Sequence, residues 1–198
     1  MPQVRRRCSR LTMMMLRRRL VLHGQRRQLS TTSSSLSIEG TIPKDGKGIA
    51  VNQYAQVQRK FTNMDVTQFA NLVGDHNPLH SSFSGDLLQQ DLLQKAGLIQ
   101  WDGKNTKPLV HGMLASSLFS CIFGTLIPGS VYRSQVLQFM HPIFADDCVI
   151  GRVQVIKVRP VPSRGGLFVV CDTSVVKEDD VVCIKGQAHV WLPAGTKR

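Results

Sequence analysis

The spacing of apolar residues changes along the chain, and each spacing predicts a different kind of element. Between residues 62 and 74 the apolar side chains lie three and four positions apart, as on one face of a helix: Val66, Phe69, Ala70 and Val73. Thr62 precedes this stripe as a capping residue, and Gly74 follows it, so we predict a helix that ends at Gly74. Residues 49–61 alternate loosely and predict a strand.

Two further helices are predicted downstream. Residues 84–96 carry Leu88 and Leu92 one turn apart, between a possible cap at Ser84 and a stop at Gly97. Residues 108–132 contain no Asp, Glu, Lys or Arg, and residues 113–127 are apolar almost all round. Such a helix is expected to be buried. It is too short for a membrane span, which needs about 20 apolar residues.

From residue 130 onward the pattern is that of strands. Four valine-rich stretches, residues 131–140, 148–159, 167–177 and 181–192, are separated by short polar or Gly- and Pro-containing turns. Short turns connect antiparallel neighbours. Together with the earlier elements, they predict one α+β domain over residues 49–198, with an antiparallel sheet wrapped around one buried helix.

A polar stretch at residues 74–80 carries the chemistry. Asp75 and His80 lie five positions apart, and an ionised carboxylate with a neutral imidazole can together handle a water molecule and its proton. Pro78 keeps Asn77 out of the helical region, so the chain must turn here, which can bring the pair together. The alternative is a plain helix end with an Asx turn and a surface histidine.

Residues 69–80, followed by His111-Gly112-Met113, resemble the hydratase-2 motif of the MaoC-like dehydratases. The resemblance covers residues 50–192 and implies a hot-dog fold, a homodimer and no cofactor. It also implies an enzyme that adds water to trans-2-enoyl thioesters, or removes it from (3R)-3-hydroxyacyl thioesters. Two departures are Ser82, where family members often carry an acid, and a long gap of 31 positions from His80 to His111.

The resemblance assigns roles to several residues. Asp75 and His80 would be catalytic, Asn77 would orient the loop or the water, and Ser120 would lie near the site as a further hydrogen-bonding group. Gly112 would polarise the thioester carbonyl, which suits its place at a helix N-terminus, where free N–H groups favour developing negative charge. For His111 we expect a packing or capping histidine.

Charge is concentrated at one end of the chain. The formal net charge is +12, but nine arginines and no acid lie within residues 1–35, which leaves 16 basic against 13 acidic residues from residue 36 onward. An arginine- and serine-rich, acid-free leader predicts a mitochondrial transit peptide over residues 1–35, cut near Ser30, and a matrix enzyme. The alternative, an RNA-binding arm, lacks aromatic residues for stacking on bases. Residues 36–48 predict a flexible linker.

Neither the cysteines nor the segment before His111 adds catalytic groups. Cysteines occur singly, without metal-ligand spacing, so we expect core residues and no metal. The segment around Trp101 reads as a surface insertion, or alternatively as a flap over the acyl site or a carrier contact.

Combining leader and motif, we expect a dehydratase of mitochondrial type II fatty-acid synthesis that acts on acyl carrier protein, without nucleic acid and without a membrane span. The C-terminus lacks a Ser-Lys-Leu address, which modestly disfavours the runner-up, an enoyl-CoA hydratase of β-oxidation. A thioesterase and a non-catalytic acyl-thioester-binding subunit, which would share the fold, remain as alternatives.

Overall fold

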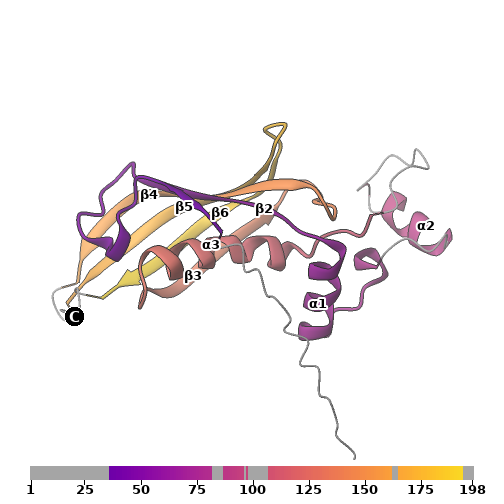
Figure 1. Cartoon of the computed structure of the whole chain (residues 1–198), viewed down its shortest axis with the longest axis horizontal. Coiled ribbons are helices and arrows are strands. Elements are labelled where there is room, and N and C mark those ends of the chain that lie inside the picture. Colours follow the sequence, from indigo (N-terminus) through magenta and orange to yellow (C-terminus); the bar gives the residue numbers. More distant parts are fainter. Residues whose placement is uncertain (1–35, 82–86, 96, 98–106, 162–164, 194–198) are drawn as a thin grey trace, which may run out of the picture. The chain divides into compact units, whose positions relative to one another are not determined.

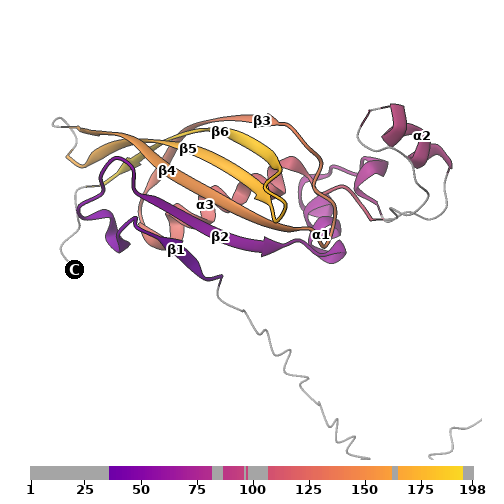
Figure 2. The same cartoon turned by 90° about the horizontal axis from the view of Figure 1, so that it is seen from above.

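A single antiparallel sheet organises the domain. The computed structural model describes residues 36–81, 87–95, 97, 107–161 and 165–193. The strands are β1 (Ile38–Gly40), β2 (Tyr54–Lys60), β3 (Val131–Phe139), β4 (Cys148–Pro160), β5 (Leu167–Lys177) and β6 (Val182–Leu192). They pair in the order β1-β2-β4-β5-β6-β3, always antiparallel (Figure 2). The helices are α1 (Asn63–Val73), α2 (Leu87–Lys95) and α3 (Gly112–Leu126), with 3-10 turns η1 (Lys44–Gly46) and η2 (Pro78–His80).

Helix α3 lies along one face of this sheet (Figure 1). Phe119, Ile122 and Phe123, spaced for one helical face, are each at most 1% exposed. The predicted α+β hot-dog arrangement is therefore confirmed. The expectation that α3 is buried all round is wrong, because its opposite face, with Met113 and Ser120, is exposed in this chain.

The contact between α3 and the sheet depends on one glycine. A Cβ atom at Gly151 of β4 would lie only 2.7 Å from Cβ of Leu118 on α3. Only a residue without a side chain lets the helix approach β4 so closely. Apolar side chains then fill the remaining space from both layers, and the valines of β4 and β5 that face α3 are completely buried.

The predicted strands agree closely with the observed ones. The prediction for β5 matches both ends, and those for β3, β4 and β6 differ by one residue at one end. The first predicted strand, residues 49–61, was too long, because only Tyr54–Lys60 pairs with β4. Alternating burial on β4 follows the two-residue period that the sequence displayed.

The predicted flexible linker at residues 36–48 is wrong. Ile38 of β1 pairs with Val57 of β2, and the N–H of Thr41 donates to the carbonyl of Tyr54 over 2.7 Å. Ile42 is 6% exposed and belongs to the core. The isoleucines hold this segment on the sheet despite the polar and glycine residues between them, so the domain includes β1.

Helix α1 has the predicted ends. Thr62 accepts a hydrogen bond from the N–H of Asp65, whose carboxylate accepts in return from the N–H of Thr62, and Gly74 closes the helix with φ of 79°. The second predicted helix is confirmed over residues 87–95, and its proposed cap at Ser84 lies outside the described residues.

Some predictions cannot be compared with the described part of the chain. The leader, residues 1–35, and the insertion around Trp101 lie outside it. Within the described segments, no helix combines the length and the apolar character that a membrane crossing requires.

Candidate active site

A tight turn after α1 brings the predicted pair together. The carboxylate of Asp75 accepts a hydrogen bond from the N–H of Asn77 (3.3 Å), and the side chain of Asn77 accepts one from the N–H of Leu79 (3.1 Å). Pro78 then begins η2, which ends at His80. As a result, Nε2 of His80 lies 3.8 Å from Oδ2 of Asp75.

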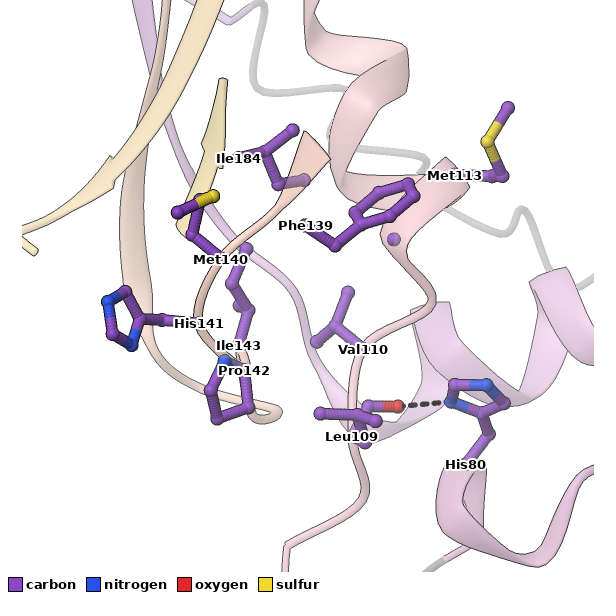
Figure 3. A pocket seen from close by; sticks show the side chains of 11 residues that line it. His80, Leu109, Val110, Met113, Phe139, Met140, His141, Pro142, Ile143 and Ile184 are labelled. Carbon is purple, nitrogen blue, oxygen red and sulfur yellow. Dashed lines mark hydrogen bonds between the residues drawn. The ribbon is translucent and has the colours of Figure 1, made fainter. Parts of the chain in front are cut away.

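The position of the proton on His80 is set by the main chain. Nδ1 of His80 lies 2.7 Å from the carbonyl oxygen of Leu109 (Figure 3). A carbonyl only accepts, so Nδ1 must carry the hydrogen, and the neutral ring presents its lone pair at Nε2. The lone pair and the carboxylate of Asp75 therefore face one another.

Leu109 is itself held by neighbouring backbone. Its N–H donates to the carbonyl of Leu79 over 2.9 Å, and it forms a bridge with Phe144. The next residue continues this pairing, because the N–H of Val110 donates to the carbonyl of Ile143 over 2.8 Å. The carbonyl that orients His80 thus belongs to a hydrogen-bonded segment directly before α3.

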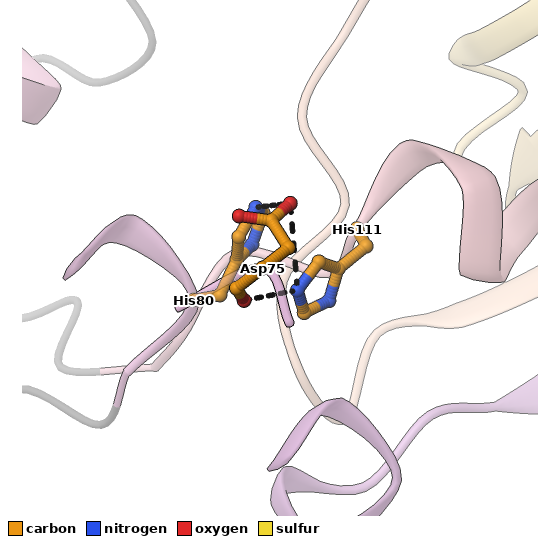
Figure 4. A group of neighbouring side chains, drawn as sticks. All are labelled: Asp75, His80 and His111. Atoms are coloured by element: carbon orange, nitrogen blue, oxygen red, sulfur yellow. Dashed lines mark hydrogen bonds and ion pairs between the residues drawn. The ribbon is translucent and has the colours of Figure 1, made fainter. Parts of the chain in front are cut away.

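His111 completes a cluster with the predicted pair (Figure 4). Its ring is stacked on that of His80, with centroids 3.6 Å apart and planes inclined by 21°, and Phe69 lies against it at 5.0 Å. Its Nε2 lies 3.3 Å from the carbonyl oxygen of Asp75, to which it donates a hydrogen bond. Burial lowers the pKa of His111; the hydrogen bond to Asp75 opposes this shift, and the nearby His80 adds to it.

An apolar pocket of about 310 Å³ opens beside His80. Gly112 lies in its wall together with Ile184 and residues 139–143, whose side chains, drawn in Figure 3, are apolar except for His141. Gly112 is the first residue of α3, so its N–H has no acceptor within the helix. The ring of Phe139 covers Gly112 closely: a Cβ there would meet the ring at 2.4 Å.

The structure brings most of the predicted site residues into one place. Asp75, Asn77, His80 and Gly112 all contribute to the turn, the cluster or the pocket. Ser120 does not: it is exposed, and it follows Gly112 by eight positions, which is about 12 Å along a helix. The hydrogen-bonding role that the resemblance implies for Ser120 stays a prediction.

His111 is the residue that sequence reasoning undervalued. It is buried as expected, at 3% exposure, but its side chain makes no capping hydrogen bond and instead contacts both members of the pair. Its place within the matched His111-Gly112-Met113 stretch was the available signal.

The three side chains of the cluster are also of the types that bind metal ions. Ligand atoms of Asp75, His80 and His111 lie within 4.8 Å of one another. Zn²⁺ binds unprotonated histidine nitrogen at about 2.0–2.1 Å. Nε2 of His111, however, carries the hydrogen that it donates to Asp75, so it has no lone pair for an ion. The donor set fits a hydrogen-bonded water better than a metal.

Oδ2 of Asp75 and Nε2 of His80 are close enough for one water molecule to bridge them from the side. A separation of 3.8 Å is too long for a direct hydrogen bond, yet a single water can donate to both Oδ2 and Nε2. Such a water would lie near the N-terminus of α3, where the N–H of Gly112 can stabilise negative charge on a carbonyl oxygen. This arrangement suits the addition of water next to a polarised carbonyl.

Comparisons with known proteins point to the same chemistry. No protein-family model matches the chain. The mitochondrial 3-hydroxyacyl-[acyl-carrier-protein] dehydratase of Solanum lycopersicum is 29% identical over 91% of this chain and 92% of its own length. Its counterpart in Arabidopsis thaliana is 32% identical over 73% and 78%. The (R)-specific enoyl-CoA hydratase of Aeromonas caviae is 30% identical over 74% and 98%, and the solved (R)-hydratase from A. caviae superposes with a TM-score of 0.58 over 74% and 99%.

Fold and site together define a hot-dog hydro-lyase, with an antiparallel sheet, a lengthwise helix and a carboxylate–imidazole pair at that helix's N-terminus. The chain belongs to the MaoC-like hydratase and dehydratase family, as the plant and bacterial relatives show.

Proposed function

We propose that the protein catalyses the reversible dehydration of (3R)-3-hydroxyacyl thioesters to trans-2-enoyl thioesters in mitochondrial fatty-acid synthesis, with acyl carrier protein as the carrier. The observation that carries the proposal is the gap of 3.8 Å between Nε2 of His80 and Oδ2 of Asp75, directly beside an apolar pocket and Gly112. The plant relatives that are named mitochondrial dehydratases support the carrier and the compartment.

The residues would act as follows in the direction of hydration. The N–H of Gly112 binds the thioester carbonyl oxygen, which makes C3 electrophilic. The water held by Asp75 and His80 forms its bond to C3 as it gives up a proton to the pair, and the pair delivers a proton to C2. In dehydration the pair removes the C2 proton and protonates the departing hydroxyl. Each direction is balanced, because the pair passes on as many protons as it takes up: from the water oxygen to C2 in hydration, and from C2 to the hydroxyl oxygen on C3 in dehydration.

Turnover of the purified protein tests this proposal. We expect loss of the conjugated double bond of a trans-2-enoyl thioester and a (3R)-3-hydroxyacyl product. Asp75→Asn and His80→Ala should each lower kcat on the order of 10²-fold or more while the far-UV circular dichroism stays unchanged. Rates close to wild type in either variant would contradict the assignment.

The carrier distinguishes two candidate functions. The relative from A. caviae is an enoyl-CoA hydratase, and this favours an (R)-specific enoyl-CoA hydratase as the second candidate. Parallel assays with CoA and acyl-carrier-protein thioesters of one chain length compare them. A higher kcat/KM with acyl carrier protein supports the first candidate, and the reverse order supports the second. Binding without turnover on both carriers would indicate a non-catalytic acyl-thioester-binding subunit.

The functional unit is proposed to be a homodimer joined along β3. This strand lies at the edge of the sheet, and its apolar side chains Val131 and Val136 are 44% and 61% exposed. An exposed apolar edge strand favours pairing with a second chain. Sedimentation equilibrium should show a dimer, and Val136→Lys should shift it toward monomer. A monomeric wild-type protein at micromolar concentration would rule this out.

The leader is proposed to direct the protein to mitochondria and to be removed on import. Its composition, with nine arginines and no acid in residues 1–35, supports this. Intact mass of the protein purified from its own cells should place the mature start near residue 30, before β1. A full-length species in those cells would contradict the proposal.

A further inference from the structure

We infer that His111 is a positioning residue for the reaction: a neutral imidazole whose Nε2–H holds the main chain of Asp75 while its ring holds the ring of His80. The role of His111 in turnover rests on the proposed function, whereas the geometry around His111 does not. It goes beyond the assignment of Asp75 and His80, because it names the part that keeps the two at the distance of one water.

The first half of the role concerns Asp75. Residues 74–80 are exposed or only partly buried, and the side chain of Asp75 is 50% exposed, so its own surroundings hold it weakly. The donor bond from His111 to its carbonyl, at 3.3 Å, links this turn to the residue directly before α3. Nε2 of His111 also lies 3.9 Å from Oδ2 of the Asp75 carboxylate.

The second half concerns His80. The carbonyl of Leu109 fixes Nδ1 but leaves the ring free to swing about that hydrogen bond. The stacked ring of His111, at 3.6 Å, covers one face and removes this freedom. His111 is 3% exposed and packs against Phe69, so of the two stacked rings it is the one held rigidly. Nε2 of His80 is thereby kept pointing at Asp75.

The role requires that His111 stays uncharged while the pair exchanges protons. Among the described residues, its Nδ1 is buried and has no hydrogen-bond partner. Adding a proton there would bury an unsatisfied charge, and two stacked imidazolium rings would repel one another. The groups that face His111 are His80 and Asp75, with the uncharged ring of Phe69 behind it. Proton transfer therefore involves His80 and Asp75 and leaves His111 neutral.

Nitrogen-15 NMR of histidine-labelled, unmodified protein tests the geometry without any substrate. We expect His111 to show a protonated Nε2 and an unprotonated Nδ1 at neutral pH, and to keep this neutral form below pH 6, where an ordinary histidine is charged. His76, in the same turn but exposed, serves as the internal comparison. A His111 that is protonated on Nδ1 at neutral pH, or that titrates together with His76, would overturn the inference whatever the enzyme's activity.

Two variants with opposite losses test the role in turnover. His111→Phe keeps a ring for stacking and loses the donor; His111→Gln keeps an N–H donor and loses the ring. Each should lower kcat about tenfold or more and change KM less than threefold, because the apolar pocket is intact. His76→Gln, the control, should stay within twofold of wild type. A wild-type kcat in His111→Phe would contradict the inference, because it would leave His111 with a packing role alone. If the wild-type protein lacks hydratase activity while the NMR result holds, the proposed function fails and the geometry stands.

Discussion

Replacing Gly112 by alanine should damage the enzyme through a neighbour rather than through the glycine itself. A Cβ at this position would lie 2.4, 2.7 and 3.0 Å from three ring atoms of Phe139. Contacts between carbon atoms are favourable near 3.5–4.0 Å, so the ring must move by about 1 Å. Phe139 is 57% exposed, at the end of the edge strand, and has room to do so.

The cost to stability should be small. Holding the ring of Phe139 away from its preferred rotamer costs about 0.5–1.5 kcal/mol. Alanine is favoured over glycine in a helix by about 0.5–1 kcal/mol, which offsets much of this cost at Gly112. The free energy of unfolding, measured in urea, should therefore change by less than about 1 kcal/mol.

The cost to catalysis should be larger, because the displaced ring lines the pocket beside the N–H that is proposed to bind the thioester carbonyl. A misplacement of about 1 Å near reacting groups costs up to about 10²-fold, and we expect kcat/KM of Gly112→Ala to fall between 10- and 100-fold. The double variant with Phe139→Ala should recover at least tenfold, a coupling of about 1.4 kcal/mol.

The assay is turnover of a trans-2-enoyl thioester by the four proteins of this cycle, at one chain length. Phe139→Ala alone should be only a few-fold slower than wild type, since it removes a wall but adds no obstruction. A double variant as slow as Gly112→Ala would refute the reasoning, and would place the loss in the backbone of residue 112.

Three further outcomes follow from burial and packing. Gly186→Ala should lower the free energy of unfolding by about 3 kcal/mol or more, because its Cβ would lie 1.9 Å from a backbone carbonyl oxygen of β3. Gly124→Ala has open space around it and should be neutral or stabilising. Thermal melts of both variants test this. In the native protein, iodoacetamide should modify Cys148 before Cys171, because the Cys171 thiol is buried and burial raises its pKa to about 12. Mass spectrometry of peptides measures the order, and modification of Cys171 first would contradict the prediction. The free energy of unfolding should fall as pH drops below about 6.5, because His111 binds a proton in the unfolded chain more readily than in the folded one, where burial lowers its pKa. A steeper loss in His111→Phe than in wild type would contradict this.

Much of the fold could be predicted because local signals and tertiary structure agree. The capped helix α1 and the end of the chain from β3 to β6 have strong periods and clear turn residues, and tertiary packing reinforces both. The segment before β2 could not be predicted this way. Its serines and glycines suggest a linker, and it is ordered by pairing with β2, 15 to 19 positions further along the chain, which the composition of the segment itself does not reveal.

The site could be predicted in part for a similar reason. Asp75 and His80 are close in sequence, and the Asn77-Pro78 turn makes their meeting a local event. His111 comes from a distant segment, and its contacts depend on where α3 starts relative to that turn. Ser120 follows Gly112 by eight helical positions and lies on the exposed face of α3, so the single chain does not bring it into the cluster, and its role stays a prediction.

The hydrogen bond between His80 and the carbonyl of Leu109 has a consequence for how this site tolerates sequence change. Every residue type has a main-chain carbonyl, so the proton arrangement of the imidazole is insensitive to which side chain occupies position 109. The side chain at position 109 can thus reshape the pocket that it lines without disturbing the tautomer of His80. The shape of the pocket and the orientation of His80 depend on different atoms of one residue, and selection or protein engineering can alter the first while the second stays fixed.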